Sequence, residues 1–115
     1  MLTIDALKAY GADTRAGIKR CLGCEAFYLG LVEMLVCDEN FELLATAVKQ
    51  RDAEACLHFA YALADTADSL ALSPLGEQLD KFIVCLQVRG DSAVVERQYM
   101  LVCRVLEKLK MIQQN

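Results

Sequence analysis

The only histidine of the chain, His58, begins a set of polar residues that recur at helical spacing. Tyr61, Asp65 and Asp68 follow it, with Ala64 beside them, and this spacing places them together on one face of a helix. An imidazole is nucleophilic near neutral pH and can also bind a metal ion. A metal site would need further ligands, but no second histidine lies on this face. We therefore predict neither a metal nor a cofactor here.

Six cysteines offer a second source of chemistry. Cys21 and Cys24 form a C-x-x-C pair, a spacing found in zinc and redox sites. No second C-x-x-C or Cys/His pair completes a set of four ligands. The remaining cysteines are scattered singly, mostly within apolar patterns, at Cys37, Cys56, Cys85 and Cys103. Because a buried free cysteine behaves as a small hydrophobe, we interpret all six as free structural thiols.

The composition favours one helical domain over residues 1–115. Hydrophobic residues make up 56% of the chain, and one proline and six glycines leave few helix breakers. No apolar run approaches the roughly 20 uncharged residues of a membrane span, and the first residues lack the basic region of an export signal. The net charge of −4 argues against nucleic acid as a partner. We therefore expect a cytoplasmic protein that binds neither membrane nor nucleic acid.

Apolar periodicity predicts two short helices followed by four long ones. The short helices are expected over residues 3–10, closed by Gly11, and 13–21, capped by Asp13. The long helices are expected over residues 24–50 (with a break or kink at 38–40), 52–70, 74–88 and 91–112. Ser73 and Pro74 are predicted to be the N-cap and first residue of the third long helix. The short links favour an all-α, antiparallel up-down four-helix bundle with two short N-terminal helices.

The same periodicity predicts which side chains are buried. In the helix over 52–70, the apolar stripe comprises Cys56, Ala60, Leu63, Ala67 and Leu70. The polar residues Tyr61, Asp65 and Asp68 should be exposed. In the first long helix, the residues expected to face inward are Phe27, Leu31, Met34 and Leu35, with Tyr28 and Val32 on a neighbouring stripe.

The central stretch of the chain resembles the histidine-containing phosphotransfer (HPt) family in its compact, single-domain bacterial form. The motif of that family reads roughly A-H-x-L-K-G-x-x-x-x-L-G-L-x-P-L. Aligned without a gap, Ala60 and Leu63 fall on its alanine and first leucine, and residues 70–75, L-A-L-S-P-L, fall on L-G-L-x-P-L. Residues 17–28, G-I-K-R-C-L-G-C-E-A-F-Y, also resemble the family segment G-L-x-R-F-x-G-N-x-x-x-Y. That register gives Cys21 and Cys24 ordinary structural positions.

Members of the HPt family carry a phosphoryl group on an imidazole between the aspartates of receiver domains. In the alignment, the acceptor histidine falls on Tyr61, the neighbouring lysine on Ala64, and the following glycine on Asp65. A phenol stays protonated at neutral pH, a methyl group cannot steady a phosphoryl charge, and an added carboxylate repels it. The resemblance therefore implies a pseudo-HPt module rather than an enzyme, which binds a response-regulator receiver domain or a hybrid histidine kinase without carrying phosphate. Its partner-binding residues would be His58, Tyr61, Ala64, Asp65 and Asp68.

Two alternatives remain open. His58 lies one turn before Tyr61 and could act as a displaced phosphoacceptor, although no lysine or arginine occurs between Ala53 and Gly76 to assist it. The chain could instead be a structural or self-associating helical module, including a homodimer through an aromatic contact patch around Tyr61 and Phe59.

Overall fold

The computed structural model describes residues 1–114, and in that range it contains helices but no strand. The helices are α1 (Ile4–Tyr10), α2 (Thr14–Arg20), α3 (Glu25–Val36), α4 (Asn40–Lys49), α5 (Ala53–Ser69), α6 (Ser73–Gln87) and α7 (Ser92–Gln114). The prediction of an all-α fold is therefore confirmed. Within residues 1–114, no helix combines the length and the apolar character that crossing a bilayer requires.

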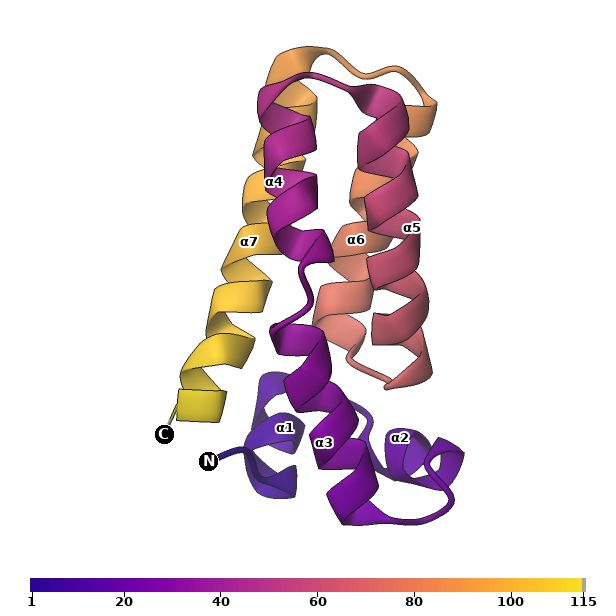
Figure 1. Cartoon of the computed structure of the whole chain (residues 1–115), viewed down its shortest axis with the longest axis vertical. Helices are drawn as coiled ribbons and strands as arrows, with labels where there is room; N and C mark the ends of the chain where they lie inside the picture. The colour runs from indigo at the N-terminus through magenta and orange to yellow at the C-terminus, as the bar shows by residue number, and fades with distance from the viewer. Residues whose placement is uncertain (115) are drawn as a thin grey trace.

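Helices α4, α5, α6 and α7 lie side by side along the long axis of the molecule, and α1, α2 and α3 gather at one end (Figure 1). α5 packs against both α4 and α6, and α6 packs against α7. At the other end of α5, the connection from α4 runs near the connection from α6 to α7. The molecule measures 41 × 25 × 21 Å. α5 therefore has neighbours along both sides, and its polar face lies between them.

Short polar side chains start several helices, as the sequence predicts. The Asp13 carboxylate accepts a hydrogen bond from the Ala16 backbone N–H at 3.1 Å, and Asp52 accepts one from Ala55 at 3.1 Å. α1 ends at Gly11, whose φ of 112° lies in the left-handed region that glycine adopts without strain. These caps fix where α1, α2 and α5 begin or end.

The start of α6 differs from the prediction by one residue. Leu72 occupies the N-cap position, and Ser73 is already the first helical residue. The Leu72 side chain is fully buried, so packing rather than a side-chain hydrogen bond fixes this helix start. Pro74 is consequently the second helical residue, where a missing N–H still removes no bond within the helix.

The core confirms the predicted stripes of α5 and α6 and corrects that of α3. The stripe from Cys56 to Leu70 is buried in α5, and α6 buries Leu75, Leu79, Phe82, Ile83 and Leu86. In α3, however, Phe27 is 50% exposed and Met34 is 69% exposed, whereas Tyr28 and Val32 are fully buried. α3 is apolar on almost every side, so periodicity does not distinguish its inner face from its outer one. The Tyr28 hydroxyl makes a hydrogen bond inside the core, and this bond helps to fix the rotation of α3 about its own axis.

Donors from the first third of the chain satisfy the last carbonyl groups of α5. The Tyr28 hydroxyl donates to the Leu70 carbonyl at 2.9 Å in a buried position. The Arg20 guanidinium donates to the carbonyls of Asp68 at 2.7 Å and Ser69 at 3.3 Å. Helix ends leave such carbonyls without intrahelical partners, and a buried one without a donor is costly. α2 and α3 therefore position the C-terminal end of α5.

Gly17 of α2 allows this arrangement because it lies directly against the Tyr28 ring. A Cβ atom at residue 17 would overlap that ring and would stand 2.9 Å from the Leu70 carbonyl oxygen. The nearby backbone N–H of Asp13 donates to the Ala71 carbonyl at 3.0 Å. The approach of α2 and α3 to the end of α5 thus depends on the missing side chain at residue 17.

Candidate functional site

The polar face of α5 forms the candidate site, and four of its five predicted residues are exposed. His58, Tyr61, Asp65 and Asp68 lie at the surface, with the Tyr61 side chain 44% exposed. The placement of Ala64 on this accessible face is wrong, because Ala64 is only 4% exposed. Ala64 lies four residues after Ala60 and directly after Leu63, so it belongs to the edge of the buried stripe. Its methyl group therefore has almost no surface to offer a partner.

Tyr61 is held at the seam between α5 and α6. The side-chain amide of Gln87, the last residue of α6, donates a hydrogen bond to the Tyr61 hydroxyl oxygen. Two exposed apolar residues lie near Gln87. Val84 is one turn earlier on α6, and Val88 directly follows Gln87. We call the surface formed by Tyr61, Asp65, Asp68, Val84 and Gln87 the α5–α6 face. Sequence reasoning missed its α6 half, although exposed valines within an amphipathic helix are a usable signal.

The α5–α6 face is acidic around Asp68. Desolvation raises the pKa of the Asp68 carboxyl, the charges of Asp80 and Asp65 raise it further, and Arg20 lowers it. The desolvation has a local cause, since the Asp68 Oδ1 atom lies over Gly76 of α6, where a Cβ atom would overlap it. Asp68 as a whole is nevertheless an exposed residue. A phosphoryl group at Tyr61 would therefore meet negative charge on this side of α5.

We predict that Asp68→Asn stabilises the protein at neutral pH but not in acid. The raised folded-state pKa means that the folded protein binds the proton more tightly than the unfolded chain. Ionisation of Asp68 consequently costs stability as the pH rises, and asparagine removes that cost. Because the side chain is largely exposed, solvent screening limits the gain to about 0.5 kcal/mol or less. Urea unfolding of both proteins at pH 7, and again below the titration range of aspartate, measures this gain; an equal difference at both pH values would contradict the assignment.

His58 lies toward the N-terminal end of α5, whereas Arg20 binds near the C-terminal end of this helix. Its ring contacts the Phe59 ring edge-on, with centroids 5.3 Å apart. Arg20 binds the backbone at Asp68, ten residues further along, which corresponds to about 15 Å of helix. A phosphoryl group on His58 would therefore receive no help from Arg20.

A groove of about 560 Å³ borders the site on the side of α3. Its apolar lining comes from Leu31, Met34 and Leu35 of α3 and from Leu70 after α5. Asp65 lies at its edge on α5, so the groove adjoins the α5–α6 face. The sequence did not indicate this groove, because it results from the rotation of α3 that exposes Met34.

The cysteines lie in varied surroundings. Cys21 and Cys56 are buried, Cys24 and Cys37 are exposed, and the other two are half-buried. Cys24 occupies the N-cap position of α3 but makes no capping hydrogen bond there. Within residues 1–114, no three His, Cys, Asp or Glu side chains come together as a metal site. The absence of a disulfide or metal at Cys21 and Cys24 stays a prediction.

Apolar and acidic side chains gather at the surface of α5 and α6. A half-exposed aromatic ring, exposed valines and three nearby carboxylates line α5 and α6, and no lysine or arginine of α5 stands beside them. Comparison with protein-family models, with curated proteins and with solved structures found no match for this chain.

Proposed function

We propose that the chain is a degenerate HPt-like module of a two-component phosphorelay, which binds a receiver domain through α5 without carrying phosphate. The receiver would belong to a response regulator or a hybrid histidine kinase, and the compartment would be the cytoplasm. The observation that carries the proposal is the position of Tyr61. Its side chain is exposed at the place where the family motif has its acceptor, while Leu63, Leu70 and Leu75 of the same motif are buried.

The proposed architecture is the antiparallel up-down bundle of the HPt family, with α1 and α2 as the short N-terminal helices. Its support is the packing of α4 on α5, α5 on α6 and α6 on α7, each pair joined by a short connection. Tyr61, which the alignment places at the acceptor position, lies near the middle of α5, at the seam with α6.

Three features oppose phosphate transfer at Tyr61. A phenol is a poor nucleophile while it is protonated, and the aryl phosphate that it could form is a poor donor to a carboxylate. The position of the family lysine is filled by Ala64, which is buried. The carboxylates of Asp65 and Asp68 lie on the same face as Tyr61 and repel an incoming phosphoryl group.

The same face suits protein contact. Tyrosine is common at the centre of interfaces because it buries a large ring while its hydroxyl keeps a polar partner, here Gln87. Val84 on α6 and Val88 directly after this helix add exposed apolar area. The acidic side chains around Asp68 would select for a partner surface with cationic groups at its rim.

A binding screen tests the proposal. Purified chain is titrated by calorimetry with receiver domains in their unphosphorylated and phosphorylated forms. We expect at least one receiver to bind, and Tyr61→Ala to weaken that binding by about tenfold or more. Met111→Ala is the matched control, because Met111 is an exposed apolar residue on α7, away from α5, and should have no effect. The proposal fails if no receiver binds, or if the two variants weaken binding equally.

One observation favours a second candidate function, a self-associating helical module. α3 exposes Phe27 and Met34, and Leu22 just before it is also exposed, so this helix presents an apolar outer face. A second copy of the chain would bury these residues. A dimer in sedimentation experiments, together with no binding to any receiver, would place this candidate first.

A further inference from the structure

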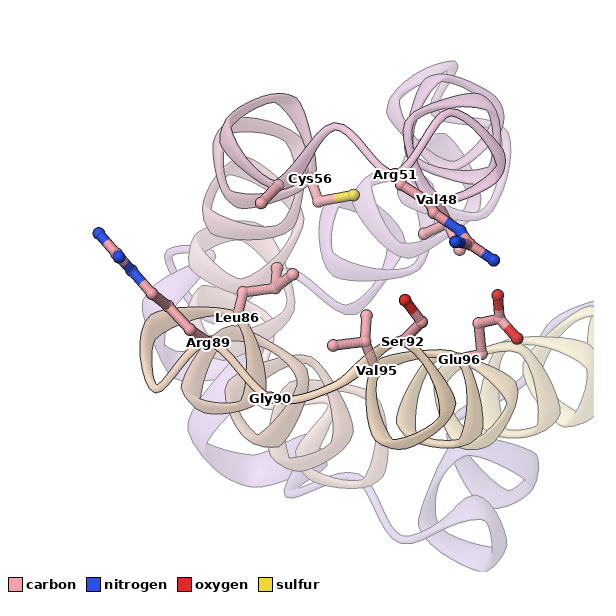
Figure 2. A pocket seen from close by; sticks show the side chains of 10 residues that line it. Val48, Arg51, Cys56, Leu86, Arg89, Gly90, Ser92, Val95 and Glu96 are labelled. Carbon is pink, nitrogen blue, oxygen red and sulfur yellow. The ribbon is translucent and has the colours of Figure 1, made fainter.

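A second hollow lies at the end of the molecule where α5 begins. The connection from α4 to α5 and the connection from α6 to α7 meet there and enclose a cavity of about 310 Å³ (Figure 2). We call it the end cavity. Its volume is at the lower limit of sites that bind small molecules. Nothing in the proposed receiver binding uses it.

The floor of the end cavity is apolar. Val48 of α4, Cys56 of α5, Leu86 of α6 and Val95 of α7 each contribute to its lining. Figure 2 shows Leu86, Val95 and the Cys56 thiol pointing into the space between the helices. Cys56 and Leu86 are buried, and Val48 and Val95 are half-buried. An aliphatic group that entered this space would leave water and gain about 25 cal/mol for each Å² that it buried.

The mouth of the end cavity carries one charge of each sign. Arg51, in the connection before α5, and Glu96 of α7 extend over the opening from opposite walls, and the Ser92 hydroxyl lies beside them (Figure 2). Among residues 1–114, neither Arg51 nor Glu96 takes part in an ion pair. Arg89 also lines the cavity, but its guanidinium points away from it (Figure 2). The mouth therefore presents a cation and an anion that face each other without forming an ion pair.

We propose that the end cavity binds a small zwitterion with an aliphatic body, of the class of the free aliphatic α-amino acids. The ligand carboxylate would pair with Arg51, the ligand ammonium with Glu96, and the aliphatic side chain would rest on Leu86 and Val95. A simple carboxylic acid would place its charge beside Glu96, and a simple amine would place its charge beside Arg51. Only a ligand with both charges satisfies both walls of the mouth.

Binding of L-leucine, followed by calorimetry and by NMR shifts of the residues around the cavity, tests this proposal. Two analogues each remove one charge: 4-methylpentanoate lacks the ammonium and 3-methylbutylamine lacks the carboxylate. We expect L-leucine to bind at least about tenfold more tightly than either analogue, because each loses a charge-assisted hydrogen bond. Glycine, which keeps both charges but has no aliphatic body, should bind more weakly than L-leucine.

Variants at the mouth locate the site. Arg51→Gln and Glu96→Gln should each weaken leucine binding by about tenfold or more. Arg89→Gln is the matched control and should leave the affinity unchanged, because that side chain points out of the cavity. All three residues are exposed, so circular dichroism should show the natural helix content in each variant. The proposal is overturned if leucine does not bind, if either analogue binds as tightly, or if Arg89→Gln has the same effect as Arg51→Gln.

Discussion

A chain that carries both Tyr61→His and Asp65→Gly takes up an acid-labile, base-stable phosphoryl group from a phosphorylated receiver domain, whereas the natural chain does not. In this transfer, a ring nitrogen forms the P–N bond while the P–O bond of the aspartyl phosphate breaks. The aspartate leaves as a carboxylate and the imidazole loses its N–H proton. We expect transfer at least about 100-fold faster than in the natural chain, because the scaffold then holds a nucleophilic imidazole in place of a phenol.

The design follows from the exposure of the individual residues. Asp65 is exposed one turn after residue 61, so glycine there removes a repelling charge and leaves room for the receiver. A lysine is not introduced at residue 64, because Ala64 is buried and the new side chain would have to leave the core. The variant therefore tests the nucleophile and the local charge without disturbing the packing of α5.

His58 supplies the control for this experiment. The natural chain and its His58→Ala variant are incubated with the same phosphorylated receiver, and the phosphoryl group is followed through acid and base treatment. We expect neither to be labelled. If the natural chain is labelled and His58→Ala abolishes the label, His58 is the carrier and the pseudo-HPt proposal is wrong. If the Tyr61→His, Asp65→Gly variant binds the receiver but stays unlabelled, the alignment that places residue 61 at the acceptor position is wrong.

Alanine at two helical glycines should change stability in opposite directions. We expect Gly17→Ala to lower the free energy of unfolding by about 1–3 kcal/mol, because the new Cβ would overlap the Tyr28 ring. We expect Gly30→Ala to raise it by about 0.5–1 kcal/mol, because alanine costs less backbone entropy than glycine in a helix. Apart from its chain neighbours and the backbone of its own helix, a Cβ at residue 30 meets no atom within 4 Å. The second variant is thus a matched control for the first.

Urea unfolding, monitored by circular dichroism, measures both changes on the same scale. A reduced midpoint for Gly17→Ala together with an unchanged slope would show that the native state lost stability. Stabilisation by both variants would mean that residue 17 has room for a side chain. The close packing of α2 on Tyr28, and with it the described position of α3, would then be incorrect.

The sequence predicts the fold best where polar and apolar residues alternate clearly. α6 is such a case: its buried residues Leu75, Leu79 and Phe82 are separated by charged and amide side chains, so one face is marked. α3 lacks this contrast, and its exposed and buried residues could not be separated by periodicity. There the decisive interaction is the long-range hydrogen bond from Tyr28 to Leu70, which no local pattern encodes.

The candidate site likewise has one part that the sequence predicts and another part that it does not. The exposure of Tyr61, Asp65 and Asp68 follows from their spacing on one helix, and the prediction is confirmed. The spacing does not place Ala64 correctly, because this residue lies at the border between the buried and the exposed face of α5. There, a small rotation of the helix decides whether the side chain is buried or exposed. The α6 half of the face, the groove beside α3 and the end cavity each combine residues that are distant in the chain. Their assembly depends on tertiary packing, which a single sequence does not display.

The bonds that close the C-terminal end of α5 join residues synthesised early to residues synthesised late. Tyr28 and Leu70 are separated by 42 residues, and Arg20 and Asp68 by 48. A ribosome therefore makes α1, α2 and α3 before it makes their partner carbonyls. Helices of seven residues, such as α1 and α2, do not persist alone in water. The segment that holds α1, α2 and α3 consequently waits for α5 to emerge, and until then the apolar side chains of α3 face water or a chaperone.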